Sequence, residues 1–323
     1  MDLFESTMIG GVSARNHFIR SATAEGKATE DGFPTETIRQ VYLNLARNEV
    51  GVIITSLASV ADYEKSSGYQ LMMDRDGLIP AYQEITETVH AEGGSIVMQL
   101  VHGSSSAQAF PEQAKILGPS SIRNPISGLV PRQMDVDDMA EVAGLFARAA
   151  VRAKRAGFDG VQIHGAHSCL LSQFLSPVFN QRTDAFGGSR ENRFRFVREV
   201  YDAVRGAVGP AYPVWMKLDC TDGFENGLST EDFLWNGEQL AMRGLDAIEV
   251  SGMRQPRVYK GAYYREAAER LAERINAPVI LTGGVRSVED MQVICAESRV
   301  QFFGMSRPFL AHPDYITRLK DKR

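Results

Sequence analysis

The chain has 323 residues, of which 44% are hydrophobic and 23% are charged, and its formal net charge is −5. This composition is typical of a globular protein, and the acidic balance lacks the basic excess of a nucleic-acid backbone binder. With no apolar run of about 20 residues, no secretory signal and only Cys169, Cys220 and Cys295, the sequence predicts a cytoplasmic protein without a membrane or nucleic-acid partner.

Eight short apolar runs, rich in β-branched or aromatic residues, alternate with helical patterns, as parallel strands buried on both faces would. The predicted strands are His17–Thr23, Gly51–Thr55, Ser95–Val101, Gly160–His164, Pro213–Leu218, Ala247–Ser251, Pro278–Thr282 and Val300–Met305. The predicted helices are Thr35–Asn48, Leu78–Glu92, Asp135–Ala156, Arg190–Val208, Ser229–Met242, Tyr264–Ile275 and Ser287–Ala296. Eight alternating units favour an α/β TIM (β/α)8 barrel over an open doubly wound sheet.

Two connecting segments are unusual. The segment Ser104–Gln133, after the third strand, is rich in Pro, Ser and Gly and is too long for a simple connector, so we predict a functional lid. The segment Ser176–Phe196 carries many charges of both signs, which indicates an ordered, ion-paired loop leading into a helix.

A histidine pair follows the fourth predicted strand, where barrel enzymes place functional groups. His164 ends this strand and His167 follows three residues later, so a short helical turn would point both imidazoles at one spot. Two N–H donors could hold a carbonyl or anionic oxygen. A zinc site needs a third ligand, and only Cys169 is nearby, so we predict no metal site. The alternative is ordinary loop hydrogen bonding.

Two polar residues interrupt apolar strands. Lys217 ends the fifth strand, and a buried cation there needs an anionic ligand or an ion pair with a carboxylate such as Asp219 or Asp222. Gln99 lies inside the third strand, where its amide could bond a ring edge with alternating N–H and C=O groups, or simply the backbone.

Phosphate-binding features follow the last two strands. Gly283 and Gly284 come after the seventh strand, and glycines let backbone N–H groups approach a phosphate. Ser306 and Arg307 follow the eighth strand, where the arginine could add a bidentate contact. Many phosphate loops have a glycine at the position of Ser306. The alternative is a plain turn that leads into a helix.

These residues together resemble the old yellow enzyme family of flavin-dependent oxidoreductases. The resemblance starts at LFESTMIGGVSARNHFIRSAT, which is similar to the family's N-terminal hairpin and first strand. It continues through MQLVHG, IHGAHSCLLSQFLSPVFNQRTDAFGGSRENRFRF and PVILTGG to FFGMSRPFLAHPD, and so covers nearly the whole chain. It implies a single FMN-binding (β/α)8 barrel domain over residues 1–323, with FMN at the barrel mouth.

The resemblance also implies roles for individual residues. Ser21, Ala22 and Thr23 would lie along the flavin, with Thr23 near its C4 carbonyl. Gln99 would bond the pyrimidine edge, and Lys217 would lie at the N1–C2=O edge. The phosphate would be held by Gly283, Gly284, Ser306 and Arg307. A cation at the N1–C2=O edge stabilises the anionic reduced flavin. NADH or NADPH would reduce the flavin, and an α,β-unsaturated carbonyl compound, its oxygen held by His164 and His167, would then take the hydride.

The sequence departs from the family at the proton donor. The family pattern H-x-x-H-x-Y-L places a tyrosine where this chain has Cys169. A thiol with a pKa of about 8.5 is protonated at neutral pH and could donate, although it is shorter than a phenol. Three hypotheses follow: Cys169 donates the proton, water or another side chain does, or the substrate is not an enone.

Two other functions compete with ene reduction. Larger relatives continue into a cysteine cluster for an iron–sulfur centre and nucleotide-binding domains, so the chain could be the barrel portion of a dienoyl-CoA reductase or an amine-oxidising dehydrogenase. This sequence ends at Asp321–Arg323, and from its cysteines we expect no iron–sulfur centre. The other is a non-catalytic ligand-binding barrel, which the set of Gln99, His164, His167 and Lys217 disfavours. The resemblance leaves a homo-oligomer open.

Overall fold

The computed structural model describes residues 1–107, 109, 115–253 and 261–321. Its main sheet has nine strands, and all of its strand pairs are parallel. In chain order the strands are β3 (Phe18–Arg20), β4 (Val52–Ser59), β5 (Leu71–Met72), β6 (Ile96–Val101), β9 (Gly160–Gly165), β10 (Val214–Asp219), β11 (Ala247–Ser251), β12 (Val279–Thr282) and β13 (Phe302–Met305). Pairing of β3 with both β13 and β4 closes the sheet, while β5 only extends the edge of β4. The predicted TIM barrel is confirmed.

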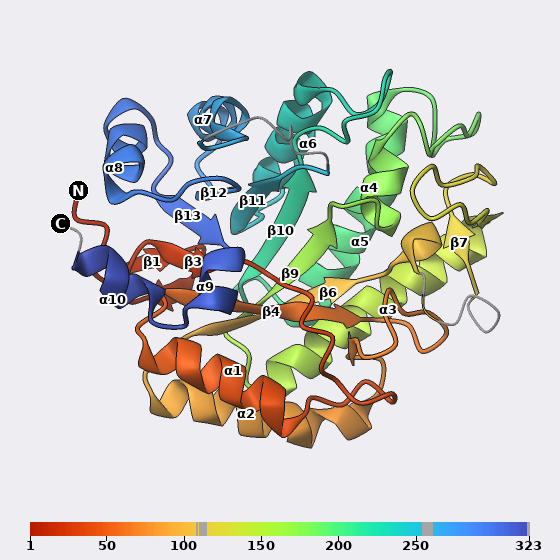
Figure 1. The fold of residues 1–323 in the computed structure, drawn as a ribbon. Helices are drawn as coiled ribbons and strands as arrows, with labels where there is room; N and C mark the ends of the chain where they lie inside the picture. Colours follow the sequence, from red (N-terminus) through yellow and green to blue (C-terminus); the bar gives the residue numbers. More distant parts are fainter. Residues whose placement is uncertain (108, 110–114, 254–260, 322–323) are drawn as a thin grey trace.

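Helices surround the closed sheet (Figure 1). The longer ones are α1 (Glu36–Arg47), α2 (Ile79–Ala91), α3 (Val136–Arg155), α5 (Arg190–Val208), α6 (Thr230–Met242), α7 (Arg265–Arg274) and α8 (Val288–Glu297). Short ones are α4 (Leu170–Leu175), α9 (Arg307–Ala311), α10 (Tyr315–Lys320) and the 3-10 turns Asp76–Leu78 and Ser104–Ser106. Side-chain caps define several starts, for example Ser189 at α5 and Asp135 in a capping box at α3. No helix among the described residues is long and apolar enough to cross a membrane.

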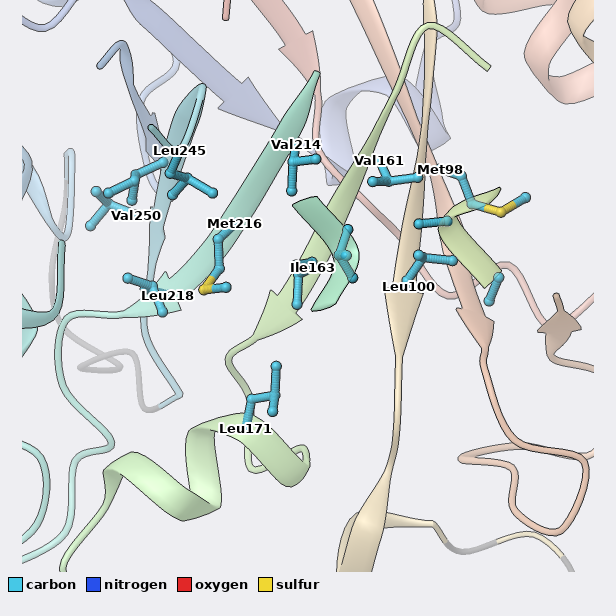
Figure 2. Close-up of a cluster of buried hydrophobic side chains, with 14 of the residues drawn as sticks. Met98, Leu100, Val161, Ile163, Leu171, Val214, Met216, Leu218, Leu245 and Val250 are labelled. Carbon is cyan, nitrogen blue, oxygen red and sulfur yellow. The ribbon is translucent and has the colours of Figure 1, made fainter. Parts of the chain in front are cut away.

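The strands and helices are held together by the outward-facing side chains of the barrel. Figure 2 shows Met98 and Leu100 of β6, Ile163 of β9 and Met216 of β10 in one buried cluster. Alternate residues of each strand contribute to this layer because successive strand side chains point to opposite faces. Burial of this apolar layer fixes which residues of each strand face into the barrel.

The amino-terminal end of the barrel interior is apolar and sealed. An antiparallel pair, β1 (Thr7–Ile9) and β2 (Val12–Ala14), lies there. Its buried side chains pack with inward-facing barrel residues, in one cluster of Ile9, Val12, Ala14, Ile19, Val52, Ile54, Val97, Trp215, Ala247, Ile280 and Phe302. The indole Nε1 of Trp215 donates to the carbonyl oxygen of Gly10 at 3.2 Å, which ties the pair to β10. Ligands are therefore confined to the other end of the barrel.

One strand and one loop depart from the sequence-based expectation. The strand predicted at Gly51–Thr55 continues as β4 to Ser59, across a register irregularity between Ile54 and Leu57, where polar residues hide the strand pattern. The segment 104–133 contains a short parallel pair, β7 (Leu117–Gly118) and β8 (Arg132–Gln133). Buried Arg182 donates to the carbonyl oxygens of Pro119 and Met134, which directly follow β7 and β8, so it holds this strand pair in place. The function of the segment 104–133 as a lid stays a prediction.

Candidate active site

A cavity of about 610 Å³ lies at the carboxyl ends of the barrel strands. Eight of the residues predicted for the site line it, namely Ser21, Ala22, His167, Lys217, Gly283, Gly284, Ser306 and Arg307. Four others, Thr23, Gln99, His164 and Cys169, are not among its lining residues. Thr23 nevertheless lies near the cavity, because its hydroxyl is 2.7 Å from the hydroxyl of Ser306, which lines it.

Glycines and two arginines form one wall of the cavity. Gly283 and Gly284 have φ angles of 115° and 84°, which L side chains rarely adopt, and a Cβ on Gly284 would clash with the carbonyl oxygen of Gly261. Arg307 and Arg286 line the same wall, and among the described residues neither guanidinium has a carboxylate partner. Close backbone approach beside two unpaired cations suits a phosphate group.

The cation at the cavity floor has a partner that we did not predict. The Lys217 ammonium lies 3.0 Å from the Glu249 carboxylate, and both side chains are almost fully buried. Our sequence-based candidates, Asp219 and Asp222, were wrong as the ion-pair partner, because the paired carboxylate comes from the neighbouring strand β11. Burial alone would raise the pKa of Glu249, but the Lys217 charge and hydrogen bonds from its neighbours outweigh it and lower that pKa.

This carboxylate organises a wider buried network. Its Oε1 accepts hydrogen bonds from the hydroxyls of Ser21 at 2.5 Å and Thr282 at 2.8 Å. Its Oε2 accepts from the amide nitrogen of Gln162 at 2.8 Å. The amide oxygen of Gln162 in turn accepts from the amide nitrogen of Gln99 at 2.7 Å. The side chain of Gln99 is therefore held by protein groups at one end of its amide.

The histidine pair lies beside the cavity. The rings of His164 and His167 meet edge to face, with centroids 5.1 Å apart. The His167 side chain is 41% exposed and lines the cavity, whereas His164 is buried and its Nδ1 has no hydrogen-bond partner in the described part of the chain. Desolvation, followed by neighbouring positive charge, lowers the pKa of both imidazoles, so both are neutral at pH 7.

A strained turn positions His167. Both His167 and Ser168 have positive φ angles, 58° and 61°, which is uncommon for residues other than glycine. The Asp219 carboxylate accepts from the backbone N–H of His167 at 2.6 Å, and Nε2 of His167 lies 2.8 Å from the Ser251 hydroxyl. These contacts hold the imidazole against the cavity. Desolvation raises the pKa of Asp219 to about 7.

Cys169 is the N-cap residue directly before helix α4 and is not among the residues that line the cavity. The residue is 7% exposed, and burial, followed by the charges of Glu64 and Asp219, raises the pKa of its thiol far above the ordinary value. The geometry and the pKa therefore both weaken the hypothesis that Cys169 is a proton donor.

The whole chain matches a known family. Residues 2–323 match the family model described as NADH:flavin oxidoreductase / NADH oxidase family. The chain belongs to this family. This is the old yellow enzyme family of FMN-dependent oxidoreductases that the sequence resemblance predicted.

Its relatives come in two lengths. The chain is 32% identical to a NADH oxidase of Thermoanaerobacter brockii over all of this chain and 51% of that protein. It is 31% identical to a NADPH dehydrogenase of Bacillus pumilus over 96% of this chain and 92% of that protein. The solved structure of an Old Yellow Enzyme from Pichia is 26% identical, with a TM-score of 0.86, over 99% of this chain and 86% of that one. The chain thus spans about half of the NADH oxidase and nearly all of the NADPH dehydrogenase.

FMN, the cofactor of the family, fits the residues of this cavity. The glycines of the wall with Arg286 and Arg307 suit the phosphate, and the buried Lys217 at the floor suits a polar ring edge. Sequence reasoning missed Glu249, Gln162, Ser251 and Arg286. A signal existed for Glu249, since it interrupts the apolar run AIEVS in the same way that Lys217 interrupts PVWMK.

Proposed function

We propose that this chain binds FMN in the cavity and reduces the C=C bond of an α,β-unsaturated carbonyl compound, with NADH or NADPH as the hydride donor. The observation that carries the proposal is that one cavity contains His167, backed by His164, together with Lys217 and the glycine–arginine wall. A polar substrate oxygen and a phosphate-bearing cofactor could therefore lie in one space. The FMN, when bound, supplies the hydride at its N5 atom.

The residues of the chain would hold the cofactor along its length. Ser21 and Ala22 would lie along the ring system, with Lys217 at the N1–C2=O edge. Gln99, although outside the cavity lining, would present the oxygen of its amide to the pyrimidine edge, since the amide nitrogen donates to Gln162. The phosphate would lie against Gly283, Gly284, Ser306 and Arg307, and Thr23 would act through its contact with Ser306.

His167, which lines the cavity, would bind the carbonyl oxygen of the substrate, and His164, whose ring packs against it edge to face, would be the second donor. Both are neutral at pH 7, so each can donate one N–H without adding a full charge to the site. Donors fixed in place before the reaction stabilise the negative charge that develops on this oxygen. Removal of one such donor costs about 10²- to 10³-fold in rate.

The proton for the α carbon would come from water that enters through the cavity. Cys169 is a poor candidate because its thiol is buried away from the cavity lining and holds its proton strongly. Water needs only access to the exposed His167 side of the cavity. This choice keeps ene reduction compatible with the missing tyrosine.

The decisive experiment is a reductive titration followed by reoxidation. We expect the purified, FMN-loaded protein to bleach anaerobically with NADH or NADPH and to regain its colour with cyclic enones. His167→Ala should slow reoxidation by about 100-fold and leave bleaching largely unchanged. His90→Ala, which removes a histidine on α2 that contacts Asp159, is the matched control.

Two results would contradict the proposal. A colourless protein that cannot be loaded with FMN would exclude the cofactor site. A protein that bleaches but is reoxidised by none of the enones would leave the cofactor site intact and exclude ene reduction.

A second candidate is the barrel portion of a larger flavin dehydrogenase of the dienoyl-CoA reductase or amine-oxidising type. The alignment with the NADH oxidase, of which the chain covers 51%, favours it. Turnover of an amine or a dienoyl-CoA, with no reoxidation by simple enones, would select this candidate.

A further inference from the structure

The inward faces of four neighbouring strands bring together Gln99, Gln162, Lys217 and Glu249. Each side chain is buried, and Glu249 is completely inaccessible to solvent. Their contacts form a continuous path from the β6 amide through the β9 amide to the β11 carboxylate and the β10 ammonium. The proposed function uses Gln99 and Lys217 but leaves Gln162 and Glu249 without a role.

We propose that Glu249 is a positioning residue for FMN, because it neutralises Lys217 and, through Gln162, fixes which end of the Gln99 amide faces the cofactor. This inference rests on the proposed binding of FMN in the cavity. The two effects have separate causes and can be measured separately.

The first effect concerns charge. The Lys217 ammonium and the Glu249 carboxylate are 3.0 Å apart, so together they contribute no net charge at the cavity floor. An unpaired cation there would favour reduced FMN, which carries more negative charge than oxidised FMN. Because the Glu249 carboxylate lies beside the Lys217 ammonium, the preference of the site for reduced over oxidised FMN is smaller. Glu249 therefore lowers the reduction potential of the bound cofactor.

The second effect concerns hydrogen-bond direction. An ionised carboxylate only accepts, so the group that Gln162 turns toward Glu249 must be its NH₂. The Gln162 oxygen then faces Gln99, which must donate with its own NH₂. The oxygen of Gln99 is left as the end of its amide that can accept from a ring N–H. A glutamine at position 249 could donate or accept, and the direction of the whole path would no longer be fixed.

The test measures FMN, not substrate turnover. Midpoint potentials are determined anaerobically against reference dyes, and dissociation constants of oxidised FMN by fluorescence. Glu249→Gln should raise the ratio of affinities for reduced over oxidised FMN by about tenfold or more, which equals a rise of about 30 mV or more for a two-electron couple. Lys217→Gln should lower the potential, and the double variant should return close to wild type.

Two further variants separate charge from direction. Gln162→Leu breaks the path and keeps the charge pair, so it should weaken the binding of oxidised FMN by about tenfold without moving the potential. Asp246→Asn removes a carboxylate that lies just before the same strand, at the sealed end of the barrel, and should change neither quantity.

Each part of the inference has an outcome that overturns it. The charge effect is excluded if Glu249→Gln has the same midpoint potential as the wild type. If Glu249→Gln does not fold, the charge effect is excluded if the double variant has the same potential as Lys217→Gln. An unchanged dissociation constant in Gln162→Leu removes the direction effect. A wild-type protein that binds no FMN would instead contradict the proposed function itself, and a protein that binds FMN but ignores enones leaves both measurements in place.

Discussion

The two ends of the barrel interior are built from the same strands but hold together in different ways. On β10, Trp215 belongs to the sealed apolar end, and Lys217, two residues later, belongs to the polar network at the cavity. On β11, Ala247 and Glu249 show the same change. Apolar burial is non-directional and stabilises each group separately, whereas a buried charge is stable only when its partners are present. The sealed end therefore supplies stability, and the cavity end supplies a defined arrangement of charges and donors.

The largest expected effect is at the sealed end. Trp215→Ala should lower the free energy of unfolding by about 3–5 kcal/mol, because it leaves a large cavity under the β1–β2 pair. Urea unfolding followed by far-ultraviolet circular dichroism measures this loss. Trp235→Ala on α6, where the indole is half-buried, is the control and should cost less. Equal losses in the two variants would contradict the difference between the sealed end and the surface.

The next effect is a dependence of the free energy of unfolding on pH, caused by a buried carboxyl group at the cavity end of the barrel. Burial raises the pKa of Glu64, which follows β4, from 4.5 to about 7. The folded state then binds this proton more tightly than the unfolded state, so the wild type loses stability as the pH rises from about 4.5 to 7, by about 3 kcal/mol.

The variant Glu64→Gln cannot titrate and should avoid this loss. Its stability relative to wild type should therefore increase between about pH 4.5 and pH 8, as measured by urea unfolding across that range. The exposed Glu87→Gln on α2 should show no such trend. A constant difference between Glu64→Gln and wild type at every pH would contradict the prediction.

A smaller effect is expected on FMN affinity, and it distinguishes a glycine in the cavity wall from a glycine in another tight turn. Gly284→Ala should weaken FMN binding by about tenfold or more, since φ is 84° and the new Cβ would clash with Gly261. Gly188→Ala introduces comparable strain at a φ of 79° but has no atom within 4 Å of the new Cβ. It should leave FMN affinity unchanged, and fluorescence titration compares the two variants. Equal affinities would show that the glycine wall does not contact the cofactor.

The smallest expected effect concerns Cys169. Replacement by alanine should change enone turnover by less than about twofold, because the thiol does not line the cavity. Steady-state rates across a neutral pH range test this expectation. A loss of about 100-fold with unchanged FMN binding would restore Cys169 as the proton donor.

The fold could be predicted from local pattern because most barrel strands are short, mainly apolar runs that alternate with helices, and such patterns are properties of neighbouring residues. The site was predictable where a residue type is unusual for its position. Gly283 and Gly284 with positive φ angles, and a lysine at the end of a buried strand, are examples. In each of these cases the backbone or the burial demands a special residue.

The contacts among these residues were not predictable, because barrel neighbours come from adjacent strands that are distant in sequence. Lys217 required a counter-charge, but the nearest carboxylates in the sequence, Asp219 and Asp222, were wrong as its partner, and Glu249 on β11 lies beside it. Asp219 instead accepts the backbone N–H of His167. For the same reason the amide of Gln99 could be noticed, but its contact with Gln162 could not.

Closure of the barrel has a consequence for how the protein is made. Strand β3 pairs with β13, and the Thr23 hydroxyl lies 2.7 Å from that of Ser306, so the cavity joins residues from both ends of the sequence. During synthesis the ribosome releases Ser21 and Ala22 long before Ser306 and Arg307. A nascent chain therefore cannot assemble the complete cofactor cavity until β13 and the residues that follow it have emerged, and FMN would bind only after that point of translation.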